Sequence, residues 1–84
     1  MPCYQTRALV RLRPSVLDPA GEATRAAAVR LGVEGIKRLR IGKLIDLEIE
    51  APDEQEARRQ LEFLAERLLA NPVIESWSLE ELSP

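Results

Sequence analysis

Hydrophobic and polar residues alternate along the first part of the chain, residues 4–13. Because the side chains of a strand point alternately to its two faces, this pattern predicts a half-buried β-strand. Leu9 is the exception, since it falls among the polar positions, and Pro14 and Ser15 end the strand. The apolar face carries these residues: Tyr4, Thr6, Ala8, Val10 and Leu12.

The next segment predicts a helix that starts at Asp18. An aspartate at the N-cap accepts hydrogen bonds from free backbone N–H groups, and Pro19 suits the first helical position. Gly32 suits the residue that follows the helix. Because the apolar stripe is mostly alanine, we expect the helix to pack closely on a sheet. The stripe at helical spacing consists of Ala20, Ala23, Ala27 and Leu31.

Alternation returns at Ile36 and continues to Glu50, which predicts a long middle strand. Lys43 interrupts the apolar positions, and Leu44 interrupts the polar ones. A hairpin turn at residues 42–43 is an alternative, but an unbroken strand keeps the apolar face intact. We therefore predict one strand with a bend or bulge at Gly42. Its apolar face carries Leu39, Ile41, Ile45, Leu47, Ile49 and Ala51.

A second helix and a last strand complete the chain. Asp53 and Glu56 form a pair typical of a capping box. Asn71, which suits a left-handed conformation, and Pro72 end the helix. A short strand over residues 73–79 follows. The apolar positions of the helix are Ala57, Leu61, Leu64, Ala65 and Leu68.

The order strand-helix-strand-helix-strand predicts an α+β fold in a single domain over residues 1–84. A ferredoxin-like two-layer sandwich has four strands, one more than this chain supplies. Residues 36–50 at about 3.3 Å each would span roughly 50 Å, although a compact chain of this length has a radius of gyration near 12 Å. We therefore expect the sandwich to be completed by dimerisation.

Composition excludes several classes of function. The chain has 84 residues, with 12 Lys and Arg against 14 Asp and Glu, so its net charge is -2 and gives no support to nucleic-acid binding. It has no histidine and a single cysteine, Cys3, which argues against His-based catalysis, a disulfide or a thiolate metal site. No apolar run of about 18 residues and no secretory signal is present. We expect no membrane association and a cytoplasmic location.

Four short segments, in this order and spacing, resemble the PurS family, the small subunit of phosphoribosylformylglycinamidine (FGAM) synthase. Ala20 departs from the glutamine that the family usually carries, and Trp77 stands where tyrosine or phenylalanine is common. The segments are Val16-Leu17-Asp18-Pro19 with Gly21, Leu31-Gly32, Leu39-Arg40-Ile41-Gly42-Lys43, and Leu68-Leu69-Ala70-Asn71-Pro72-Val73-Ile74-Glu75.

The resemblance implies a non-catalytic subunit of a glutamine- and ATP-dependent ligase of purine biosynthesis. Such a subunit bridges a glutaminase and a large synthetase, so that ammonia reaches formylglycinamide ribonucleotide. It implies no cofactor, and ATP would bind elsewhere in the complex. The alternative, which rests on fold analogy alone, is a stand-alone ferredoxin-like dimer that senses a small ligand or serves as a dimerisation module.

Candidate sites in the residues themselves are few. Asp46, Glu48 and Glu50 could hold Mg²⁺, but successive side chains on one strand face lie about 7 Å apart, which favours a solvated or interface row. Arg38 and Arg40 with Lys43 could hold a phosphate, but no glycine-rich loop opens a helix there, so pairing with another strand or subunit is preferred. The ammonium of Lys43 needs either a bend or a partner at an interface.

Two further residues have open roles. Cys3 lacks a base and is expected to be a half-buried small residue. Trp77 either caps the core or anchors a partner, and the sequence favours neither.

The expected homodimer, or a higher homo-oligomer that contains it, forms around the middle strand. Antiparallel self-pairing centred near Leu44 would set Arg38 opposite Glu50 and Arg40 opposite Glu48. The predicted subunit interface comprises Arg38, Arg40, Gly42, Lys43, Leu44, Asp46, Glu48 and Glu50. No catalytic, cofactor-binding or metal-binding residue is predicted.

Overall fold

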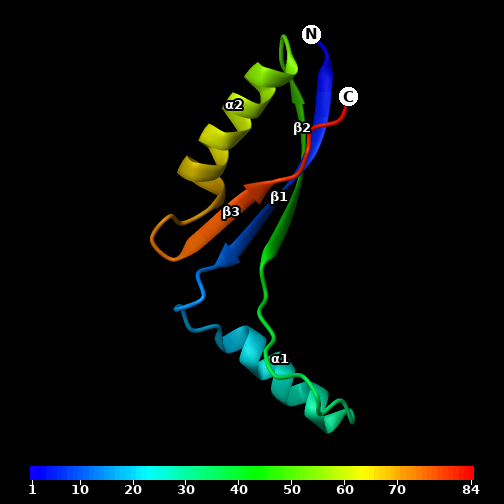
Figure 1. Ribbon diagram of the computed structural model, residues 1–84, viewed down its shortest axis with the longest axis vertical. Helices are drawn as coiled ribbons and strands as arrows, with labels where there is room; N and C mark the ends of the chain where they lie inside the picture. Colours follow the sequence, from blue (N-terminus) through cyan, green and yellow to red (C-terminus); the bar gives the residue numbers. More distant parts are fainter.

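The predicted helices and strands are present in the predicted order in the computed structural model, which describes residues 1–84. Three strands form one antiparallel sheet in the order β2-β1-β3, and α2 lies over one face of it (Figure 1). The α+β class is therefore confirmed. The elements are β1 (Cys3–Leu12), α1 (Pro19–Arg30), β2 (Lys43–Glu50), α2 (Glu54–Leu64) with a π-helical turn (Ala65–Leu69), and β3 (Glu75–Leu79).

The faces of β1 follow the predicted alternation. Thr6, Ala8 and Val10 are buried, whereas the arginines between and beyond them are exposed. β1 pairs with β2 from Cys3 opposite Glu50 to Val10 opposite Lys43, and it pairs with β3 on its other side. β1 is therefore the central strand, and β2 and β3 are the two edges.

The core lies between α2 and the sheet. Val10 is the largest side chain that is fully buried, so the core is thin, as expected for so short a chain. Leu82, near the chain end, joins the core and is held in place by Ser83, whose backbone exchanges two hydrogen bonds with Gln5. The central cluster consists of Ala51, Ala57, Leu61 and Leu82.

Both ends of the second helix differ in part from the prediction. Asp53 accepts a hydrogen bond from the Glu56 backbone N–H at 2.8 Å, as expected for an N-cap. The Glu56 carboxylate accepts instead from Arg59 and Gln60, and these hydrogen bonds lower its pKa to about 2. At the other end of the helix, the prediction that Asn71 adopts a left-handed conformation is wrong, because Gly32 is the only residue with positive φ. A wider π turn ends the helix, with the Ala70 N–H donating to Ala65 at 3.0 Å.

α1 does not pack on the sheet, so that expectation is wrong for the single chain. The helix lies beyond the end of the sheet, far from α2 (Figure 1). Its apolar stripe stays largely uncovered, and Leu31 is 84% exposed. The radius of gyration is 16.5 Å and the extents are 51 × 26 × 14 Å, well beyond the 12 Å or so of a compact chain. The sheet of this chain simply ends before it reaches α1.

The predicted middle strand is correct only in its second half. β2 begins at Lys43, and residues 36–42 run beside α1 without strand pairing (Figure 1). The physical reason is that β1 ends at Leu12, so no strand of the same chain lies beside this segment. The hairpin at residues 42–43 does not form either. Gly42 allows a close approach at this point, since a Cβ there would lie 2.7 Å from the Val10 carbonyl oxygen.

Two side chains tie the start of α1 to the segment that follows the helix. Asp18 accepts from Ile41 N–H at 2.8 Å and from Gly21 N–H at 2.9 Å, and these hydrogen bonds lower the pKa of its carboxyl group. Arg40 donates to the carbonyl oxygens of Arg13 and Val16. We call residues 13–42 the arm, because these few contacts position it as a unit.

The two N-caps should contribute unequally to stability. Asp53→Ala is expected to lower the free energy of unfolding by about 1 kcal/mol, the usual effect of a lost N-cap. Asp18→Ala should cost more, because the Ile41 N–H also loses its acceptor. Asp18→Asn, which keeps one acceptor oxygen, should fall between wild type and Asp18→Ala. Urea unfolding followed by Trp77 fluorescence measures these losses, and equal losses for the two alanine variants would contradict a second role for Asp18.

Candidate functional site

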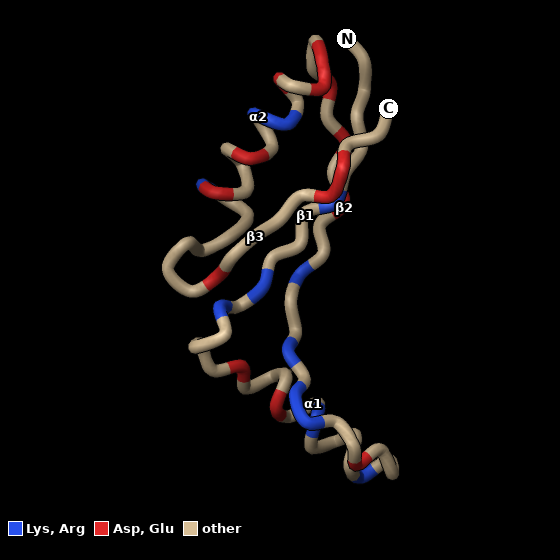
Figure 2. The backbone as a smooth tube through the Cα atoms, viewed as in Figure 1, with Lys and Arg blue, Asp and Glu red and all other residues tan.

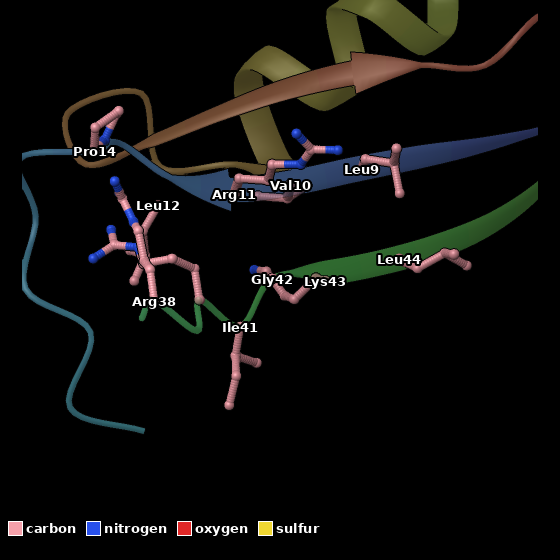
Figure 3. A pocket seen from close by; sticks show the side chains of 11 residues that line it. Leu9, Val10, Arg11, Leu12, Pro14, Arg38, Ile41, Gly42, Lys43 and Leu44 are labelled. Atoms are coloured by element: carbon pink, nitrogen blue, oxygen red, sulfur yellow. The ribbon is translucent and has the colours of Figure 1, made fainter. Parts of the chain in front are cut away.

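A groove of about 460 Å³ opens where β1 and the start of β2 diverge (Figure 3). We call it the notch. It brings together five of the eight predicted interface residues. It also includes residues of β1 that the sequence analysis did not assign to any site. Its lining consists of Leu9, Val10, Arg11, Leu12, Pro14, Arg38, Arg40, Ile41, Gly42, Lys43 and Leu44.

The notch is strongly basic. Its lining holds four cationic side chains and no carboxylate. Figure 2 shows Lys and Arg concentrated in the same region, between the sheet and α1. Arg40 is held by two carbonyl oxygens. Arg11 and Arg38 form no ion pair and no side-chain hydrogen bond. Three other arginines, in the sheet and in α2, do pair with carboxylates: Arg7, Arg58 and Arg59.

An apolar pair adjoins these cations. Leu9 and Leu44 lie directly opposite each other in the β1–β2 ladder, on the face that α2 does not cover. Leu44 is 55% exposed. These two residues are the exceptions to alternation in their strands, and the antiparallel register places them side by side. The open face of the sheet therefore carries an apolar spot next to unpaired arginines.

Lys43 finds its partner within the chain. Its Nζ lies 3.8 Å from Oε2 of Glu75, whose side chain is only 15% exposed. Both residues belong to the face that α2 covers, beyond the end of the helix. The ion pair thus removes the need for either a bend or a subunit contact to satisfy the ammonium group.

The carboxylate row lies apart from the notch, towards the other end of β2. Arg7 donates to Asp46 at 3.0 Å, and Gln5 donates to Glu48 at 3.2 Å. Glu50 stands opposite Cys3 at the end of the ladder. The structure contains no group of three or more Cys, Asp or Glu side chains placed to hold a metal ion. Asp46 and Glu48 therefore belong to a row of surface contacts between β1 and β2.

The structure also places Cys3 and Trp77. Cys3 is exposed at the start of β1, so the expectation that it is half-buried is wrong. Trp77 is half-buried opposite Val10, and its Nε1 donates to Glu66 at 2.7 Å. That contact, from the sheet to the turn after α2, favours the core-capping role.

No helix of the chain is both long and apolar enough to cross a membrane.

Comparison with known proteins gives one consistent answer. The family described as PurS, phosphoribosylformylglycinamidine (FGAM) synthase, matches residues 5–82. The PurS subunit of FGAM synthase from Synechocystis sp. is 51% identical over 77 residues, which cover 92% of this chain and 77% of that protein. A Thermus thermophilus PurS structure matches with a TM-score of 0.87 and 34% identity, over 99% of this chain and 98% of that one. A chain in the structure of PurLQS from Thermotoga maritima matches with a TM-score of 0.89 and 34% identity, over 96% and 99% of the two chains.

Proposed function

Because this chain belongs to the PurS family of FGAM synthase subunits, we propose that it works as the small, non-catalytic subunit that joins the two larger ones. The family match over residues 5–82 is the observation that carries the proposal. The chain bridges the glutaminase and the ATP-dependent synthetase of purine biosynthesis, so that ammonia from glutamine reaches formylglycinamide ribonucleotide. The similarity to a chain of a PurLQS structure supports this role. The cytoplasm, where such a biosynthetic enzyme would work, is its proposed location.

The chain also forms a homodimer in this proposal. β2 is an edge strand, and it has a neighbour on one side only. A second copy that pairs antiparallel with it, centred near Leu44, would lay its residues 38–42 beside residues 46–50 of the first. Each sheet then gains a fourth strand, as a ferredoxin-like sandwich requires.

The same pairing accounts for the position of the arm. Residues 36–42 run beside α1, and a Cβ on Gly21 would lie 2.5 Å from the Leu39 carbonyl oxygen. When this segment joins the sheet of the second copy, α1 is carried over that sheet. The alanine stripe, which is exposed in one chain, would then be covered.

The charge pairs of the predicted register are unequal. Arg40 already donates to two carbonyl oxygens, and Glu48 accepts from Gln5. Arg38 and Glu50 have no ion pair or side-chain hydrogen bond within the chain. The contact between Arg38 and the second copy's Glu50 therefore needs no existing bond to break, and it is the better test of the register.

Light scattering during size exclusion tests the proposal. At micromolar concentration the purified chain should have about twice the 9.4 kDa of one chain, and a stable monomer would contradict the dimer. When mixed with the glutaminase and synthetase subunits of the same organism, it should elute with both. A chain that joins neither would favour the stand-alone sensor.

A charge reversal tests the register within the same measurement. Arg38→Glu should weaken the dimer, and adding Glu50→Arg should restore part of it. Arg67→Glu, in the π-helical turn after α2, is the control and should leave the mass unchanged. If Glu50→Arg gives no rescue, the register centred on Leu44 is wrong.

A further inference from the structure

We infer that the homodimer is a domain swap, in which two copies exchange their arms because the connection from the arm to β2 is too short to turn back. The inference rests on the proposed function, because it requires the homodimer. It goes further by naming the segment that decides between one chain and two. A slightly longer connection should let the chain close on itself.

The arm is joined to the rest of the chain by two connections that lie side by side. One leads out of β1 and the other leads into β2. A Cβ on Gly42 would lie 2.7 Å from the Val10 carbonyl oxygen, so the two backbones meet there. Within the arm, Asp18 accepts from the Ile41 N–H at 2.8 Å and holds the helix to the segment that follows it. The two connections therefore form one hinge, and the arm keeps its own hydrogen bonds in any position.

The alternation of apolar residues shows how long a turn at this hinge would have to be. Residues that lie opposite each other in neighbouring strands point to the same face. Ile41, Lys43 and Ile45 share the face of the sheet that α2 covers. A hairpin that uses the whole arm and the whole of β2 must therefore set Ile41 opposite Lys43, which leaves only Gly42 for the turn. Because the tightest hairpin loops have two residues, the chain is one residue short.

Moving the turn to either side breaks contacts that the chain already makes. A three-residue turn at residues 43–45 would remove the start of β2 from its pairing with β1. A turn at residues 40–42 would draw Arg40 and Ile41 away from the oxygen atoms that hold the arm together. Gly42 also lacks the positive φ that the first residue of a two-residue hairpin turn requires. Pairing with a second copy requires none of these changes.

The shape of the single chain agrees with an arm that cannot close. Its radius of gyration is 16.5 Å, and the edge of β2 and the apolar stripe of α1 both stay uncovered. Closure within one chain would cover the same two surfaces that the dimer covers. A short hinge that prevents such closure is a usual cause of domain swapping.

Insertion of Asn-Gly after Gly42 tests the inference. It creates a three-residue loop with glycine at its last position, a common hairpin type, and sets Ile41 opposite Lys43 while β2 stays paired with β1. Closure should then outcompete dimerisation at micromolar concentration, because two linked segments have an effective concentration in the millimolar range. Light scattering during size exclusion should give the mass of one chain. Small-angle X-ray scattering should give a radius of gyration near 12 Å, as for a compact chain, in place of 16.5 Å.

Two further insertions serve as controls. The same Asn-Gly placed after Gly35, where a Cβ would meet no atom within 4 Å, lengthens the arm without changing the hinge and should leave the dimer intact. Gly-Ser-Gly-Ser after Gly42 allows many turn geometries and should also give a compact monomer. Hydrogen exchange distinguishes a closed arm, in which amides of residues 36–41 are protected, from a detached one.

The outcomes separate this inference from the proposed function. The inference is overturned if both insertions after Gly42 leave a dimer, or if they give monomers whose residues 36–41 exchange freely. Loss of cooperative unfolding in both variants would overturn it as well, because a closed chain that keeps all its contacts should fold. In each of these cases the wild-type dimer and its binding to the larger subunits still stand. A wild-type monomer would instead overturn the homodimer, and this inference with it.

Discussion

Omitting this chain from a mixture of the two larger subunits is expected to lower the rate of glutamine-dependent amidine synthesis by about a hundredfold or more. The reason is that a bridge turns the meeting of two partners into an event within one complex, which raises their effective concentration by roughly that factor or more. Alone, the chain is expected to turn over neither glutamine nor ATP. It has no histidine, and its single cysteine is exposed at the start of β1.

Replacing glutamine by a high concentration of ammonium chloride provides the control. If the chain serves only as a bridge, added ammonia should restore synthesis by the synthetase in its absence, at least in part. Product formation is measured under both conditions. Glutaminase or ATPase turnover that stays with the chain through further purification would contradict its non-catalytic role.

The second large effect is expected at Gly21. A Cβ at this position would lie 2.5 Å from both the Leu39 carbonyl oxygen and Oδ2 of Asp18, so either the backbone or the Asp18 side chain must move. We expect Gly21→Ala to lower the free energy of unfolding by about 2 kcal/mol, as is usual for overpacking. The loss should appear although alanine is the better helix former by about 1 kcal/mol.

Gly35 provides the matched control for this variant. No atom lies within 4 Å of a Cβ at Gly35, and its φ is not positive, so Gly35→Ala should change stability by less than about 0.5 kcal/mol. Urea unfolding of both variants gives the comparison. Equal stability of Gly21→Ala and wild type would mean that residues 39–41 do not lie against the start of α1.

The sequence predicts best what is decided locally. Alternation assigned the two faces of β1, because a strand with one buried face needs polar residues on the other. Asp18 and Asp53 marked the starts of both helices, because an N-cap acts within three residues of itself. The resemblance to PurS, carried by short segments around these caps and turns, agreed with the later comparisons.

What the sequence could not predict depends on partners far along the chain. Residues 36–42 have the periodicity of a strand, but periodicity does not reveal whether a neighbouring strand exists. The prediction of a strand therefore failed for these residues. The expectation that α1 packs on the sheet failed for the same reason, because the sheet of this chain does not reach α1. Leu9 and Leu44 were each visible as exceptions, yet their meeting depends on the β1–β2 register. Arg11 gave no signal at all, because arginine is ordinary at a polar position of a strand.

The separation of charge along the chain has a kinetic consequence. Lys and Arg gather where the arm joins the sheet, whereas Asp and Glu dominate the end where β2 passes into α2 (Figure 2). The single chain is therefore an electric dipole of small net charge, and the field of a second copy turns it towards the antiparallel alignment before any atoms touch. Rotational diffusion is thereby biased towards productive approach during the encounter. That bias fades once dissolved ions shorten the range of the field to about 8 Å, so the cell's own salt sets how far away the chain begins to turn.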